Sequence, residues 1–363
     1  MHSELLLRFL YKKKLLSVCR SYSKVFKKVL QQSLGVKNEE VVIFGDLGEN
    51  NHYVSPLMCG TYYLAARLLG LKTTIVLQTL KDNSMDASEA VIHTLKNVHK
   101  KSILILLSSN RIGQLGPIGK SLRRYIKEKE CKMVSTAGLG SLKSEDFIQL
   151  ADAHDLNYFK MQRFAAKLKK VMDESRVVRI MTPSGTDITF NIQRQTAISI
   201  DGNYKMFRKG GNLPAGEVYI APNMGEVEGT VVIDGAVRYR TGTLLVKKPV
   251  KLLIRKGIVS EIIGGREARI LKQTVKWAQS RSKKPSNVRM IGELGIGFNP
   301  KINLMGAMVV DEKALGTAHI ALGSNYWFGG DIYSISHLDQ VFKNPLILFD
   351  GKEFKLPKKS DLL

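Results

Sequence analysis

Cysteine is scarce in this chain, with only three among 363 residues. Cys19, Cys59 and Cys131 are far apart, odd in number and free of any CxxC spacing. Such a set excludes a disulfide framework and a zinc site built from cysteines. It predicts a reduced, cytoplasmic chain.

Long hydrophobic runs are also absent. No apolar run reaches the roughly 18 residues that a membrane-spanning helix needs, so we expect no transmembrane segment. The first residues, MHSELLLRFLYKKKLL, are partly apolar, but Arg8 interrupts the stretch and no small-residue cleavage site follows. We therefore expect no signal peptide.

Acidic residues are few relative to basic ones. The chain has 56 Lys and Arg against 32 Asp and Glu, which gives a formal net charge of +24. Residues 1–35 carry eight of the basic residues and one Glu. A nucleic-acid or anionic-membrane partner is one interpretation. The sequence has no RNP signature, zinc finger or interleaved aromatic and basic residues, so a lysine-rich surface without a specific nucleic-acid partner is the simpler one.

The first half of the chain predicts helices followed by an α/β domain. Residues 1–38 place apolar side chains at helical spacing among basic ones, which indicates a basic amphipathic helical segment. Over residues 39–175, short apolar runs such as VVIFGD and SILILLSS alternate with helical stretches. This alternation favours right-handed crossovers and an open parallel sheet covered on both faces.

The pattern changes at residue 176, after which short β-rich runs are separated by Gly and Pro. The stretch VVRIMTPSGTDITFNIQ predicts two strands around a Pro-Ser-Gly turn. One helix is expected from about Arg266 to Ser280. Residues 176–363 are therefore predicted to form an α+β, mainly β, domain.

This second domain is also predicted to bind metal, because residues of the types that ligate metal ions are clustered in it. Of the seven histidines, only His319 and His337 follow residue 160, and Asp339 stands two residues after the second. Side chains two apart on a strand point the same way, so His337 and Asp339 can reach one centre. The further candidates, all beside Gly-rich turns, are Glu217, Glu293 and Tyr326. Imidazole and carboxylate together suit zinc, cobalt, manganese or iron(II).

From about residue 176 to 352, the sequence resembles the aminopeptidase T family of metallo-aminopeptidases and its shorter relatives. The shared segments are SGTDITF, GGNLPAGEVYIAP, EGTVVIDG, ELGIGFNP, DEKALGTAHIALGSN and HLDQV. In the family's peptidases, two divalent metal ions lie among two Glu, two His, one Asp and one Tyr. The matching positions here are Glu217, Glu293, His319, Tyr326, His337 and Asp339.

This resemblance implies a metal-dependent aminopeptidase, a hydrolase that removes N-terminal residues from small peptides. Two divalent ions (zinc, cobalt or manganese) would activate a bridging water. Glu217 or Glu293 would then act as the general base. Relatives in this family enclose their sites within homodimers, so we expect a homodimer.

A second branch of the family includes the dioxygenase that opens the ring of 2,5-dihydroxypyridine with one iron(II). There, His319, His337 and Asp339 would form a two-His-one-carboxylate triad with open positions for oxygen and substrate. This triad is a subset of the six peptidase positions. Tyr326 and Glu293 favour two metal ions, so the aminopeptidase is the preferred prediction and the dioxygenase the alternative. A basic binding protein is the non-enzymatic alternative.

Overall fold

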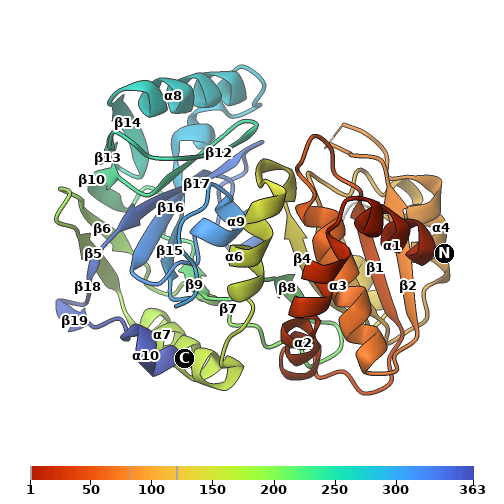
Figure 1. Cartoon of the computed structure of the whole chain (residues 1–363). Coiled ribbons are helices and arrows are strands. Elements are labelled where there is room, and N and C mark those ends of the chain that lie inside the picture. Colours follow the sequence, from red (N-terminus) through yellow and green to blue (C-terminus); the bar gives the residue numbers. More distant parts are fainter. Residues whose placement is uncertain (1, 83, 120–121) are drawn as a thin grey trace. The chain divides into compact units, whose positions relative to one another are not determined.

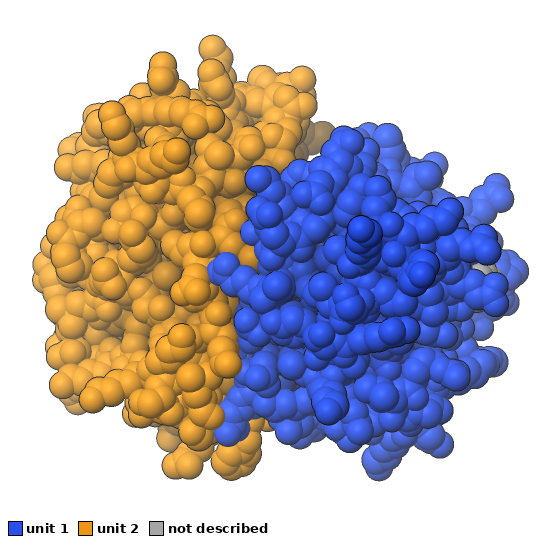
Figure 2. Space-filling model, viewed as in Figure 1, with its two compact units in different colours: residues 1–158, 202–215 blue, residues 159–201, 216–363 orange. Residues whose placement is uncertain are grey.

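The computed structural model describes residues 2–82, 84–119 and 122–363. It contains two compact units (Figure 2). Unit 1 comprises residues 1–158 and 202–215, and unit 2 comprises residues 159–201 and 216–363. The chain therefore returns briefly to unit 1 before it completes unit 2. The domain boundary that the sequence suggested, near residue 176, falls inside unit 2.

Unit 1 contains the open parallel sheet that the alternating pattern predicted (Figure 1). Its strand order is β2-β1-β3-β4-β8, and every pairing is parallel. The strands are β1 (Val41–Asp46), β2 (Thr73–Gln78), β3 (Ile103–Ser108), β4 (Lys132–Ala137) and β8 (Gly210–Asn212). All residues of β1 and β3 are buried, because central strands of such a sheet are covered on both faces.

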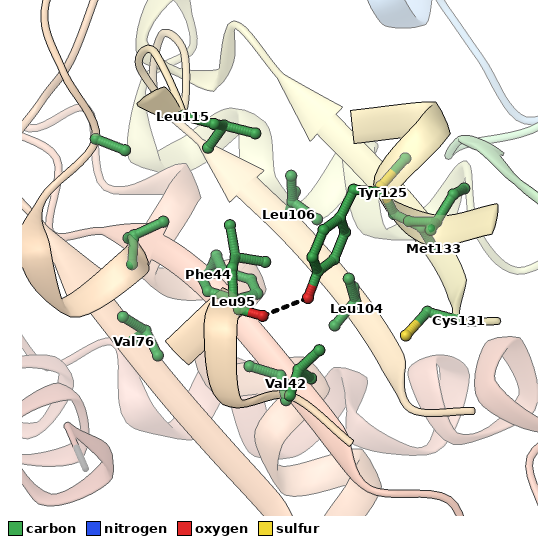
Figure 3. Close-up of a cluster of buried hydrophobic side chains, with 14 residues drawn as sticks. Val42, Phe44, Val76, Leu95, Leu104, Leu106, Leu115, Tyr125, Cys131 and Met133 are labelled. Carbon is green, nitrogen blue, oxygen red and sulfur yellow. Dashed lines mark hydrogen bonds between the residues drawn. The ribbon is translucent and has the colours of Figure 1, made fainter. Parts of the chain in front are cut away.

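Helices cover both faces of this sheet. On one face, Gly45 of β1 lies against Cys59 of α3 (Val54–Leu68). On the other face, α4 (Glu89–Asn97) and α5 (Leu122–Glu128) close a hydrophobic cluster over β1, β3 and β4 (Figure 3). Within it, the hydroxyl of Tyr125 donates to the carbonyl oxygen of Leu95 at 2.6 Å, so this buried polar group is satisfied.

The basic N-terminal segment forms α1 (Ser3–Lys12) and α2 (Leu16–Gln32). Their apolar side chains Leu10 and Phe26 are fully buried. The ring of Phe26 meets Tyr62 of α3 edge-on, with 4.6 Å between centroids. The apolar stripe therefore packs within unit 1. Among the described residues, no helix has the length and apolar character required to cross a membrane.

After helix α7 (Tyr158–Glu174), unit 2 is mainly β, as predicted for the second half of the chain, and holds two antiparallel seven-stranded sheets. The first contains β5 (Val177–Met181), β6 (Asp187–Asn191), β10 (Val227–Ile233), β13 (Val250–Arg255), β14 (Ile258–Ile263), β18 (Leu346–Phe349) and β19 (Lys352–Phe354). The second, which we call the site sheet, has the order β12-β11-β17-β16-β15-β9-β7. Its strands are β7 (Ile198–Ile200), β9 (Glu217–Ile220), β11 (Ala236–Tyr239), β12 (Gly242–Leu245), β15 (Ile291–Gly297), β16 (Thr317–Gly323) and β17 (His337–Lys343).

Candidate metal centre

Four neighbouring strands of the site sheet carry most of the predicted ligands. Strands β9, β15, β16 and β17 lie side by side and antiparallel (Figure 1). In such a sheet, directly opposed residues project from the same face, as do residues two apart along a strand. By this register, five predicted side chains share one face: Glu217, Glu293, His319, His337 and Asp339.

Small residues leave room for these side chains. Ala321 stands between Glu293 and Asp339 in one row across the sheet, and Gly295 stands opposite His319 in the next row. A Cβ atom on Gly295 would lie 2.1 Å from Nε2 of His319. The glycine of the sequence ELGIG therefore makes the space that the imidazole fills.

At one end of the cluster, His337, Asp339 and Glu293 converge. Nε2 of His337 lies 3.0 Å from Oδ1 of Asp339 and 3.5 Å from Oε2 of Glu293. One ligand atom from each residue lies within 4.8 Å of the other two. Nδ1 of His337 donates to the carbonyl oxygen of Ser324 at 2.8 Å, which orients the ring and directs Nε2 to the centre.

At the other end, His319 is fully buried. Its Nε2 lies 3.1 Å from Oε1 of Glu293 and 3.7 Å from Oε2 of Glu217. Its Nδ1 has no hydrogen-bond partner among the residues that the structure describes. Glu293 therefore joins the two ends of the cluster, with one carboxylate oxygen towards each histidine.

A lysine lies inside the cluster. The side chain of Lys313 is fully buried, and its Nζ lies 3.0 Å from Oε1 of Glu217 and contacts Oε1 of Glu312. Glu312 and Lys313 directly precede the segment that contains His319, and neither was among the predicted site residues. The sequence did contain a signal that they are buried. The run from Ala314 to Gly330 that follows them has no Asp, Glu, Lys or Arg, which indicates a buried segment.

Burial opposes ionisation of the carboxyl groups. It raises the pKa of Glu217 to about 7, against the opposing charge of Lys313. It also raises the pKa of Glu293 and that of Glu312 above the ordinary value. With Asp339, four acidic side chains face one lysine and two imidazoles, so the cluster has an excess of potential negative charge.

The neighbouring negative charge raises the pKa of both imidazoles. Burial disfavours the charged form of His319, but the hydrogen bond and charge of Glu293 outweigh it and raise the pKa to about 9. For His337, Asp339 outweighs burial and raises the pKa to about 10. A divalent cation would supply the positive charge that these protons otherwise provide. The donor set of carboxylate and imidazole suits iron(II), manganese and zinc, so the residues present fit a metal ion.

The sixth predicted ligand, Tyr326, has a different environment. Its side chain is 52% exposed. Its ring stacks on Tyr333 at 4.7 Å between centroids and meets Trp327 edge-on at 5.8 Å. Among the described residues, it makes no hydrogen bond to the other five predicted ligands. The ring centroid of Trp327 in turn lies 4.9 Å from that of His337, so Trp327 links Tyr326 to that histidine.

The His337 end of the cluster is the accessible one. The side chain of His337 is 22% exposed, whereas those of His319 and Lys313 are 0% exposed. The rings of Trp327 and Phe328 approach His337 edge-on, at 4.9 and 6.2 Å between centroids. A molecule that enters from solvent therefore meets His337 and the exposed ring of Trp327 first.

Two further acidic residues of unit 2 have structural roles. The carboxylate of Asp311 accepts hydrogen bonds from the amides of Met305 and Gly306, at 2.7 and 2.9 Å. Asp234 accepts one from the amide of Lys343 at 2.9 Å. Both carboxylates hold loops in place.

Unit 1 contains a cavity of about 840 Å³ with a different character. None of the six predicted ligands lines it, and its charged side chains are mostly lysines at the amino ends of the parallel strands. The most buried of them, Lys132, donates to Glu39 at 2.7 Å and to the carbonyl oxygens of Leu34 and Gly35. This cavity is basic and contains no candidate metal cluster among its described lining residues.

Comparison with known protein families and sequences gives a consistent result. The model of the family described as 2,5-dihydroxypyridine 5,6-dioxygenase (NicX) matches residues 21–355. A 2,5-dihydroxypyridine 5,6-dioxygenase from Pseudomonas putida KT2440 is 25% identical over 191 residues, which are 50% of this chain and 53% of that protein. The chain therefore spans about half the length of this relative.

Two solved structures share the fold. The structure of 2,5-dihydroxypyridine dioxygenase from Pseudomonas putida KT2440 matches with a TM-score of 0.71 at 19% identity, over 94% of this chain and 99% of that chain. Wild-type AmpT from Thermus thermophilus matches with a TM-score of 0.59 at 15% identity, over 94% of this chain and 98% of that chain. The resemblance to both branches is thereby confirmed at the level of fold.

The preferred prediction of a metal-dependent aminopeptidase is wrong. The family model and the sequence relative both carry the dioxygenase name, whereas the likeness to AmpT is one of fold at 15% identity. The expectation that the chain is a hydrolase or protease is wrong for the same reason. The error has a chemical cause: the one-metal triad is a subset of the six peptidase positions, so these residues do not reveal how many metal ions bind.

Proposed function

The chain belongs to the 2,5-dihydroxypyridine 5,6-dioxygenase family, and from this premise we propose that it is an iron(II)-dependent dioxygenase. Its substrate would be a dihydroxylated pyridine or a closely related hydroxylated aromatic ring, which the enzyme opens. The observation that carries this proposal is the convergence of Glu293, His337 and Asp339, whose ligand atoms lie within 4.8 Å of one another.

These three side chains would hold the iron, and His319 would contact Glu293 beside it. When bound, iron(II) would mediate the transfer of electrons from the aromatic ring to dioxygen, so that the ring is the group that is oxidised. The protein's part is to orient the donors. Ser324 fixes the imidazole of His337, and the two-residue spacing on β17 keeps Asp339 beside it. Imidazole and carboxylate ligands with open positions are typical of such iron sites.

The surroundings of His337 suit a planar substrate. Trp327 is 41% exposed and lies against the imidazole, and Phe328 lies behind it. Aromatic side chains favour edge-to-face or offset-stacked contacts with another ring. The buried His319 end offers no such entry. We therefore place the aromatic substrate at the His337 end, between the metal ligands and Trp327.

Oxygen consumption tests the proposal. Protein loaded with iron(II) without air would be mixed with 2,5-dihydroxypyridine and air-saturated buffer, while an oxygen electrode and the ring's ultraviolet absorption are followed. We expect one oxygen molecule to be consumed for each ring lost. His337→Ala should lose most of its iron and its oxygen uptake while remaining folded. His93→Ala, on the exposed side of α4, serves as control and should retain both.

Two results would contradict the proposal. One is fully iron-loaded protein that consumes no oxygen with any of a set of dihydroxypyridines and dihydroxybenzenes. The other is a folded His337→Ala variant that keeps its full iron content.

A further inference from the structure

The cluster has two halves that share Glu293. One half contains His337 and Asp339, and Oε2 of Glu293 faces it. The other half contains His319, Glu217 and Glu312, and Oε1 of Glu293 faces it. Each half has an imidazole and at least one carboxylate of its own. By donor chemistry alone, each half resembles a metal site, and a bridging carboxylate is a common arrangement between paired metal ions.

The second half already contains a cation. The ammonium of Lys313 lies between Glu217 and Glu312, with 3.0 Å to Oε1 of Glu217 and a direct contact to Glu312. An ammonium donates hydrogen bonds and accepts none, so two carboxylates are suitable partners for it. A divalent ion held by the same carboxylates would lie close to this positive charge, and the two would repel each other.

Lys313 is anchored in this place. Its amide donates to the carbonyl oxygen of Val310 at 3.0 Å, and its own carbonyl accepts from the amide of Asn299 at 2.7 Å. Its side chain is 0% exposed. The preceding turn is held by Asp311, which accepts hydrogen bonds from backbone amides. Withdrawal of the ammonium would leave two buried carboxylates without their cation, at a high cost in free energy.

From this geometry, we propose that Lys313 occupies the position of a second metal ion and limits the centre to one metal ion, bound at the His337 end. The inference rests on the proposed metal centre and goes beyond it, because it assigns Glu217 and Glu312 to the lysine. Glu293 is then the carboxylate that remains available beside His337 and Asp339.

Manganese counting tests this inference without turnover. Apo-protein would be loaded with Mn²⁺, the bound metal counted by elemental analysis, and the electron paramagnetic resonance spectrum recorded. We expect one isolated Mn²⁺ per chain in the wild type. Lys313→Met, which keeps the length and removes the charge, should bind two and give the spectrum of a spin-coupled pair. Lys343→Met, at the exposed end of β17, should remain at one.

A second variant covers the case in which Lys313→Met does not fold. Glu217→Gln/Lys313→Met removes both members of the buried pair and should still hold one Mn²⁺, because neither residue is then a metal ligand. Two ions in the wild type, one ion in folded Lys313→Met, or loss of metal from the double variant would each overturn the inference. One bound Mn²⁺ in a protein whose iron form consumes no oxygen would overturn the proposed function and leave this inference standing.

Discussion

The Nε2 atom of His337 lies 3.0 Å from Oδ1 of Asp339, two residues further along strand β17. Because side chains alternate along a strand, both point to the same face of the site sheet. The imidazolium lowers the pKa of Asp339 to about 2 despite burial, so this carboxylate is held ionised. The pair is the accessible part of the centre, and a metal ion that binds there would displace the proton on Nε2 of His337.

The close approach of the His319 ring to Gly295 predicts what an added methyl group at residue 295 would do. Gly295→Ala would place Cβ 2.1 Å from Nε2 of His319, and the imidazole would have to move. Because His319 contacts Glu293 at 3.1 Å, we expect weaker metal binding as well as a loss of about 1–3 kcal/mol in the free energy of unfolding, typical of an overpacked core. Manganese titration and urea unfolding measure both effects. Unchanged metal affinity would show that His319 is not required at its present position.

The position of Tyr326 predicts that its hydroxyl is dispensable for metal binding. Its side chain is 52% exposed, and its ring contacts with Tyr333 and Trp327 do not involve the hydroxyl. Tyr326→Phe should therefore retain the metal content of the wild type, as counted by elemental analysis. Tyr326→Ala should also keep the metal but raise the KM for the aromatic substrate. A loss of metal from Tyr326→Phe would show that the hydroxyl reaches the metal in the loaded enzyme.

The packing of the N-terminal helices predicts a structural role for them. Phe26 is fully buried and contacts Tyr62, so Phe26→Ala should lower the free energy of unfolding by about 3–5 kcal/mol. Lys24→Ala, exposed on the same helix, should change it by less than about 0.5 kcal/mol. Urea unfolding measures both. Deletion of residues 1–35 with unchanged stability and a lost, salt-dependent affinity for nucleic acid would instead favour a nucleic-acid arm.

The buried His154 predicts acid sensitivity of unit 1. Burial lowers its pKa to about 4, although Nδ1 donates to the carbonyl oxygen of Leu150 at 2.8 Å. In the unfolded chain, the imidazole of His154 has its ordinary pKa of 6.5 and takes up a proton that the folded protein does not bind. The free energy of unfolding therefore falls as the pH drops from 6.5 towards 4. The loss between pH 7 and pH 5 should be about 2 kcal/mol. The stacked ring of Phe26 offers no compensating charge.

The matched variant for this prediction is His154→Gln, whose amide can still donate to the Leu150 carbonyl. Its stability should be lower at pH 7 but change less between pH 7 and pH 5 than that of the wild type. Urea unfolding at the two pH values provides the comparison. An equal pH dependence in both proteins would assign the acid sensitivity to other groups.

The sequence by itself determined the features that depend on local periodicity. Alternating apolar runs and helical stretches indicated the parallel sheet of unit 1, and short runs between Gly and Pro indicated the mainly β unit 2. The spacing of His337 and Asp339 indicated a shared direction, because strand geometry repeats every two residues. The scarcity of histidine after residue 160 drew attention to His319 and His337, which the site sheet places on one face.

Only the tertiary structure decided which side chains meet. The short strand β8 joins the parallel sheet after the chain has passed through unit 2, and no local pattern indicates that pairing. Nothing in the spacing of Glu217 and Lys313 shows that they are in contact, because β9 and the segment after α9 (Met308–Asp311) come together through long-range packing. Composition and spacing show which potential metal ligands the chain contains, but not which of them meet in the fold. The positions of a buried ammonium and of an exposed tyrosine depend on the packed fold, since burial and charge are properties of neighbours in space.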